Sequence, residues 1–200
     1  MIKALLLVFE PVMTWDNIAR AKRSAKWVLL VYLTPLIVLT LAAELAGLSY
    51  FGKAAVYLGK PPEFAGRPKL PDKLLITYGI AQLLASYLQV ALGARIVRGI
   101  AQTFHSRHNY GQCFALTAYA YGPFFLLRVL DAFPDMFPWA SFGIGVVLMI
   151  ATLYQGVPRV LEPDPPDAFG LYICSMLLLA CLAAALRYLT LLVLAGKIHV

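Results

Sequence analysis

Five long stretches without Asp, Glu, Lys or Arg constrain this chain more than any other feature. They cover residues 27–43, 74–94, 111–127, 136–158 and 168–186. About 20 apolar residues in a helix are enough to cross the hydrocarbon core of a bilayer. Lipid offers no hydrogen-bond partners to an exposed backbone, so each stretch should be a helix. The sequence therefore predicts an all-α membrane protein with five transmembrane helices.

The composition supports the same conclusion. Hydrophobic residues make up 61% of the 200 residues and charged residues 14%, with a mean hydropathy of +0.76, against roughly half and a quarter in soluble domains. Short connections predict antiparallel neighbours and leave no room for a large extramembrane domain. We expect one five-helix domain over residues 27–196, with spans at about 27–47, 74–97, 111–130, 136–158 and 168–195.

Residues 1–26 are expected to form a cytoplasmic amphipathic segment that is retained, because the apolar run before Glu10 is too short for a signal peptide. A helix should begin with Thr14 as its N-cap and lie on the membrane surface, with Trp15 on its apolar strip. Four cations should contact anionic lipid headgroups. These are Arg20, Lys22, Arg23 and Lys26.

Lys and Arg near the spans predict the orientation. The N-terminal segment and the second connection are basic, whereas the third connection carries Asp131 and Asp135 without a cation. We therefore expect a cytoplasmic N-terminus and an exterior C-terminus, although the first connection is also basic. Pro35 and Pro123 fall inside spans, where each should kink its helix or act as a hinge.

Charges inside spans are candidate functional residues. Glu44 lies about 26 Å along the first helix and Arg187 about 28 Å along the fifth, at 1.5 Å per residue. These two helices start from the same side, so the opposite charges should reach similar depth and form a structural ion pair; a proton or substrate site is the alternative. Arg95 and Arg128 lie near span ends, from where we expect them to snorkel toward water.

Other candidate chemistry is weak. His105 and His108 are flanked by arginines and lack an acidic or thiolate partner, so a solvated loop is favoured over a metal site. The carboxylates between Glu162 and Asp167 are separated by prolines, and Asp167 is expected to cap the fifth helix. Phosphate-loop, serine-hydrolase and zinc-protease motifs are missing from the sequence. We predict no enzyme activity, cofactor or metal, and the charge of +7 indicates topology and lipid contact rather than nucleic acid.

Two short motifs indicate a family. Tyr119 and Pro123 lie in the third span, and a Leu-Tyr-Gln-Gly-Val-Pro segment at the end of the fourth span includes Tyr154, Gly156 and Pro158. Pro11 and Trp15 complete the set near the N-terminus. The chain resembles the YIP family of five-span membrane proteins, most closely its YohC-like bacterial inner-membrane branch. Eukaryotic relatives act in vesicle traffic through an acidic Rab-binding region that these residues do not contain.

Three hypotheses for function follow. The first is a non-enzymatic, self-associating scaffold that organises the membrane or the traffic of membrane proteins. The alternative is a small-solute or ion transporter or channel formed by an oligomer, although five spans cannot divide into two equal repeats. A lipid-modifying enzyme is the third.

At the fourth span we expect the helix to end at Pro158, with another backbone close to Gly156.

Overall fold

The computed structural model describes residues 2–58, 71–104, 109–133 and 136–197. These residues form helices and connections, without a strand. The candidate histidine site at 105–108, Asp135 and most of the first connection lie outside the described residues. The elements are α1 (Ile2–Phe9), α2 (Pro11–Ala21), α3 (Ala25–Trp27), the π-helix η1 (Val28–Leu33), α4 (Thr34–Tyr50), α5 (Ala54–Tyr57), α6 (Asp72–Thr103), α7 (Tyr110–Ala120), α8 (Gly122–Arg128), the 3₁₀-helix η3 (Val129–Ala132), α9 (Pro138–Val160) and α10 (Pro165–Leu194).

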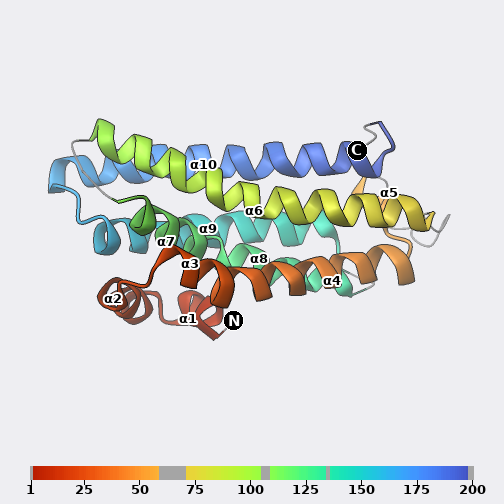
Figure 1. The fold of residues 1–200 in the computed structure, drawn as a ribbon, viewed down its shortest axis with the longest axis horizontal. Coiled ribbons are helices and arrows are strands. Elements are labelled where there is room, and N and C mark those ends of the chain that lie inside the picture. The colour runs from red at the N-terminus through yellow and green to blue at the C-terminus, as the bar shows by residue number, and fades with distance from the viewer. Residues whose placement is uncertain (1, 59–70, 105–108, 134–135, 198–200) are drawn as a thin grey trace.

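Five helical segments are long and apolar enough to cross a membrane, which confirms the predicted fold class. They are Ala25–Tyr50, Asp72–Thr103, Tyr110–Ala132, Pro138–Val160 and Pro166–Leu194. Successive segments run in opposite directions along the long axis (Figure 1). The bundle therefore has one end where α6 and α9 finish and another where α4 and α10 finish. The C-terminus lies at the second of these ends.

The two intramembrane prolines interrupt their helices in different ways. Pro35 follows the π-helical turn η1, in which the Thr34 hydroxyl donates to the carbonyl of Leu29 at 2.9 Å. A π turn and a hydroxyl compensate for the backbone donor that proline lacks. Pro123 is the second residue of α8, which begins at Gly122 directly after the break at Tyr121. Both spans therefore depart from regular α-helix next to their prolines.

Three predicted helix ends are wrong. The fifth helix begins at Pro165, with Asp164 rather than Asp167 at its N-cap and no capping hydrogen bond from that side chain. The fourth helix continues past Pro158 to Val160, because one missing donor removes a single bond that a long apolar helix tolerates. The N-terminal helix begins at Pro11 rather than Thr14, since proline suits the first helical turn.

The N-terminal segment is also packed differently from the prediction. An additional helix, α1, precedes α2, and both are seen nearly end-on where the long helices run horizontally (Figure 1). Trp15 and Ile18 of α2 are buried against the bundle, so the predicted strip does not face lipid. The exposed apolar side chains here are instead Ile2, Phe9 and Met13.

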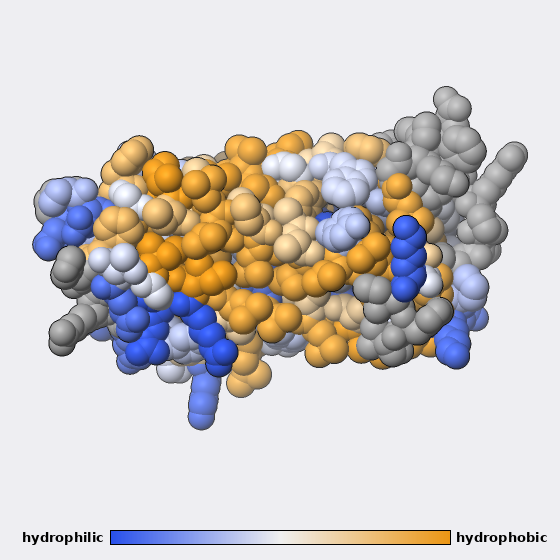
Figure 2. Space-filling model, turned by 90° about the horizontal axis from the view of Figure 1, so that it is seen from above, coloured by the Kyte–Doolittle hydropathy of each residue, from blue (hydrophilic) through white to orange (hydrophobic). Residues whose placement is uncertain are grey.

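The outer surface has the pattern of a membrane protein. Hydrophobic residues fill the middle of the face in Figure 2, and hydrophilic residues gather at its two ends. The exposed residues include long apolar side chains on four spans, such as Leu30, Ile76, Val147 and Leu177. With hydrocarbon as the solvent, such exposure carries no hydrophobic cost. The pattern confirms an integral membrane protein.

We expect the two ends of the bundle to lie on opposite faces of the membrane, with the N-terminal end in the cytoplasm. Tyr50, at the end of α4, and Thr103, at the end of α6, are both exposed. In a variant without the native cysteines, Tyr50→Cys should react with an impermeant thiol reagent added outside. Thr103→Cys should react only after the membrane is permeabilised. Labelling of both positions from one face would contradict this topology.

Candidate functional site

A buried ionic cluster connects four helices near the C-terminal end of the bundle. Glu44 of α4 is 0% exposed, and each of its carboxylate oxygens has a guanidinium partner. Arg187 of α10 donates to Oε1 at 2.6 Å, and Arg128 of α8 donates to Oε2 at 2.6 Å. Tyr78 of α6 donates its hydroxyl to Oε1 at 2.6 Å. The cluster therefore joins α4, α6, α8 and α10.

Two features of the cluster were not predicted from the sequence, namely the contribution of Tyr78 and the buried position of Arg128. Its side chain does not snorkel: the residue is 2% exposed and ends α8 inside the bundle, where η3 continues the chain. Gln82, in the amide orientation that satisfies both neighbours, accepts from Arg128 at 2.9 and 3.2 Å and donates to Thr190 at 3.0 Å. Arg187 lies over the ring of Tyr57 at 4.9 Å. The two guanidinium groups are thus held by several neighbours.

The cluster is closed to solvent. The cavity beside it, lined by Gln82, Arg128 and Arg187 among others, has a volume of about 10 Å³. That is room for about one water molecule. Buried charges are tolerated when they are paired and hydrogen-bonded, and removing one partner is strongly destabilising. The geometry indicates a structural role, in which the cluster holds the four helices together.

A second buried polar group lies nearby. Lys53, after α4, donates to backbone carbonyls of Asp131, Phe133 and Met136. Asp131 is 0% exposed and accepts from the Ser141 hydroxyl. Asp131, which the sequence places in the third connection, therefore turns its side chain into the bundle at the start of α9. These contacts fasten the α4–α5 connection to the end of the third span.

The motif residues Trp15, Tyr119 and Gly156 meet at the other end of the bundle. The Trp15 indole donates to the carbonyl of Thr152 at 3.0 Å, and its ring covers Gly156. A Cβ at Gly156 would lie 2.6 Å from Trp15 and 2.7 Å from Leu116. Trp15 packs edge-on against Tyr119, with ring centroids 6.3 Å apart. Gly156 is thus approached by side chains, not by the backbone that the sequence analysis expected.

Other motif positions lie apart from this contact. Tyr154 and Pro158 are exposed on α9, where Tyr154 packs against Tyr172 of α10 at a centroid distance of 5.1 Å. Pro11 starts α2, and Pro123 lies in the first turn of α8. An ion pair at 3.1 Å between Asp16 and Arg159 adds to the attachment of α2 to α9. Among the motif residues, it is therefore Trp15, Tyr119 and Gly156 that hold α2 on the bundle.

The fold and these contacts define a five-helix integral membrane protein with a buried ionic cluster between its helices. No group of three or more metal-ligating side chains occurs among the described residues. The Yip1 domain model matches residues 5–195, so the chain belongs to the Yip1 domain family. No curated protein and no solved structure matches this chain.

Proposed function

We propose that this protein is a non-enzymatic, self-associating organiser of the membrane or of membrane-protein traffic. The observation that carries the proposal is the closed ionic cluster: Glu44 pairs with both Arg128 and Arg187, and the cavity beside the two arginines has a volume of only about 10 Å³. A catalytic or transport site needs charged groups that a substrate can reach. Membership of the Yip1 family supports the same conclusion, since that family is not known for enzymes.

A transporter or channel formed by an oligomer is the alternative. It is favoured by one observation, the presence of three ionisable residues deep in the membrane. The cavity at Arg128 and Arg187 would have to open well beyond about 10 Å³ to admit a solute. Proton or ion flux through proteoliposomes, above that of protein-free liposomes, would decide for this alternative.

Self-association is most readily built on the outer face of α9. Ala140, Gly143, Val147 and Ala151 are exposed along one side of this helix, and a Cβ at Gly143 would meet nothing within 4 Å. Small residues on one face let membrane helices approach closely.

We further propose that the protein resides in a bacterial inner membrane, where Arg20, Lys22, Arg23 and Lys26 contact anionic lipid on the cytoplasmic side.

Replacing Gly143 tests the self-association. The larger side chain of Gly143→Leu should hold α9 away from its partner and raise the dissociation constant of the oligomer about tenfold or more, measured by energy transfer between labelled copies in liposomes. Gly99→Leu is the matched control, because Gly99 on α6 is also exposed and open. Equal association of both variants and the parent protein would rule out the α9 face.

A further inference from the structure

A basic pocket lies at the N-terminal end of the bundle, opposite the end that holds the ionic cluster. It has a volume of about 500 Å³, which is within the range of small-molecule sites. Its walls come from α1, α2, the α2–α3 connection, the start of α7 and the end of α9. Its lining includes Lys3, Lys22, Arg23, Gly111, Tyr119 and Glu162.

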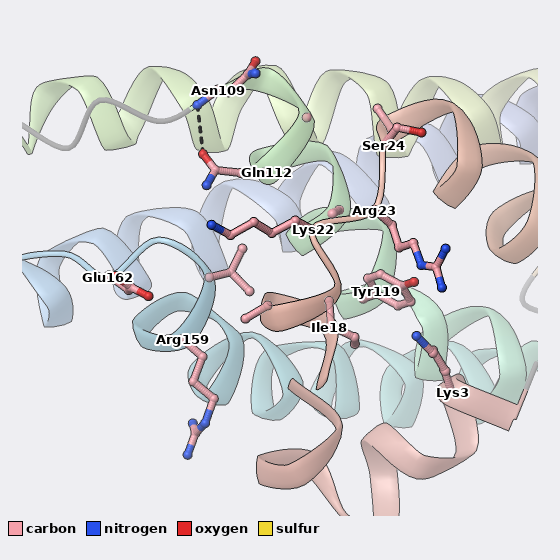
Figure 3. Close-up of a pocket in the computed structure, with 15 residues that line it drawn as sticks. Lys3, Ile18, Lys22, Arg23, Ser24, Asn109, Gln112, Tyr119, Arg159 and Glu162 are labelled. Atoms are coloured by element: carbon pink, nitrogen blue, oxygen red, sulfur yellow. Dashed lines mark hydrogen bonds between the residues drawn. The ribbon is translucent and has the colours of Figure 1, made fainter. Parts of the chain in front are cut away.

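The cations of this pocket outnumber its acids. Lys3, Lys22 and Arg23 have no carboxylate within 4.0 Å among the described residues. Glu162 is the one acid in the lining, and Lys22 extends toward its side of the pocket (Figure 3). Arg159 also lines the pocket, but its guanidinium points away and is bonded to Asp16. The pocket is therefore electropositive.

Lys3 and Arg23 both contact the ring of Trp27, which lies beside the pocket. The Lys3 ammonium lies 5.7 Å from the ring centroid of Tyr119 and 6.0 Å from that of Trp27. The Arg23 guanidinium lies 4.7 Å from the Trp27 ring. Partial burial, followed by the charge of Arg23, lowers the pKa of Lys3 below its ordinary value. An anion between these two side chains would relieve their repulsion.

The pocket also offers an unpaired buried hydroxyl and the open start of a helix. Tyr119 is 1% exposed, yet its hydroxyl has no hydrogen-bond partner among the described residues. A buried hydroxyl without a partner is costly. The α7 helix begins at the pocket, and a Cβ at Gly111 in its first turn would meet nothing within 4 Å. A ligand can thus approach the backbone N–H groups at this positive helix end.

We propose that this pocket binds the phosphate of an anionic lipid headgroup, held by Lys3, Arg23 and the Tyr119 hydroxyl. Phosphate is the ligand because it accepts from several cationic and hydroxyl donors at once. A lipid is the source because the pocket lies at the ends of three spans, beside exposed apolar side chains of α1 such as Ile2 and Phe9. The proposal concerns a defined site and does not depend on the organiser function.

Short-chain lipids test the site in the purified full chain. In detergent, dihexanoyl phosphatidylglycerol should bind saturably, whereas dihexanoyl phosphatidylcholine should bind at least tenfold more weakly, as measured by native mass spectrometry. The double substitution Lys3→Gln/Arg23→Gln should weaken phosphatidylglycerol binding at least tenfold. Tyr119→Phe keeps the ring and removes the hydroxyl, and should weaken binding about threefold to tenfold.

The matched control is Arg20→Gln/Lys26→Gln, which removes the same charge from the same segment outside the pocket. It should weaken binding less than threefold. Equal losses in the two double variants would show diffuse attraction and overturn the site, as would equal binding of the two lipids. If glycerol 3-phosphate bound as tightly as phosphatidylglycerol, the ligand of the pocket would be a free phosphate ester and not a lipid. If the double variant at Lys3 and Arg23 does not fold, Tyr119→Phe still tests the site, provided that its melting temperature equals that of the parent protein.

Discussion

Replacing Glu44 by glutamine should destabilise this protein more than any other single charge removal. The variant Glu44→Gln leaves Arg128 and Arg187 buried with their shared counter-ion gone. Breaking a buried ion pair from one side costs about 3–5 kcal/mol. Arg187→Gln should cost less, because Glu44 keeps its contact with Arg128 at 2.6 Å. Unfolding in mixed micelles, followed by circular dichroism, measures both effects.

A double-mutant cycle separates pairing from independent burial. If Glu44 and Arg187 act as partners, the double variant Glu44→Gln/Arg187→Gln should cost about 0.5–3 kcal/mol less than the sum of the single variants. Arg95→Gln is the control, because Arg95 is exposed and should change stability by less than about 0.5 kcal/mol. Strict additivity would mean that each charge is satisfied independently. It would rule out a stabilising role for the pairing of Glu44 with Arg187.

Replacing Gly156 by leucine should have the second largest effect. The new side chain would enter space that the Trp15 ring and Leu116 occupy, with contacts of 2.6 and 2.7 Å already at Cβ. Because α2 is held on α9 by this contact, Gly156→Leu should displace α2 and cost about 1–3 kcal/mol or more. The shift should appear in the thermal melt and in the near-UV circular dichroism of Trp15.

The suitable control lies on the same helix. Gly143→Leu introduces the same side chain into open space and should leave the melting of the single subunit unchanged in detergent. Leu153→Ile is a less useful comparison, since Leu153 is fully buried and an isomeric change there can cost up to about 1.5 kcal/mol. Equal melting temperatures for Gly156→Leu and the parent protein would show that α2 is not seated on Gly156.

The five spans could be predicted because length and apolarity leave a chain few choices in a bilayer. The depth of Glu44 and Arg187 could also be estimated from residue counts, because a helix rises by a constant amount per residue. The structure has these two side chains 2.6 Å apart. The family could be suggested from Tyr119, Pro123 and the segment around Gly156, and the domain match over residues 5–195 shows it.

Tertiary structure decided what each apolar or charged face meets. The strip with Trp15 has the same spacing whether it lies on lipid or on protein, and only the position of α9 buries it. Arg128 follows an apolar run, as a snorkelling residue would, but the break at Pro123 and the turn η3 keep it inside the bundle. The basic pocket joins Lys3 to Tyr119 across more than half the chain. Sequence alone therefore determined which segments enter the membrane, whereas neighbouring helices determined which side chains lipid can reach, because hydrocarbon and a protein core are equally apolar.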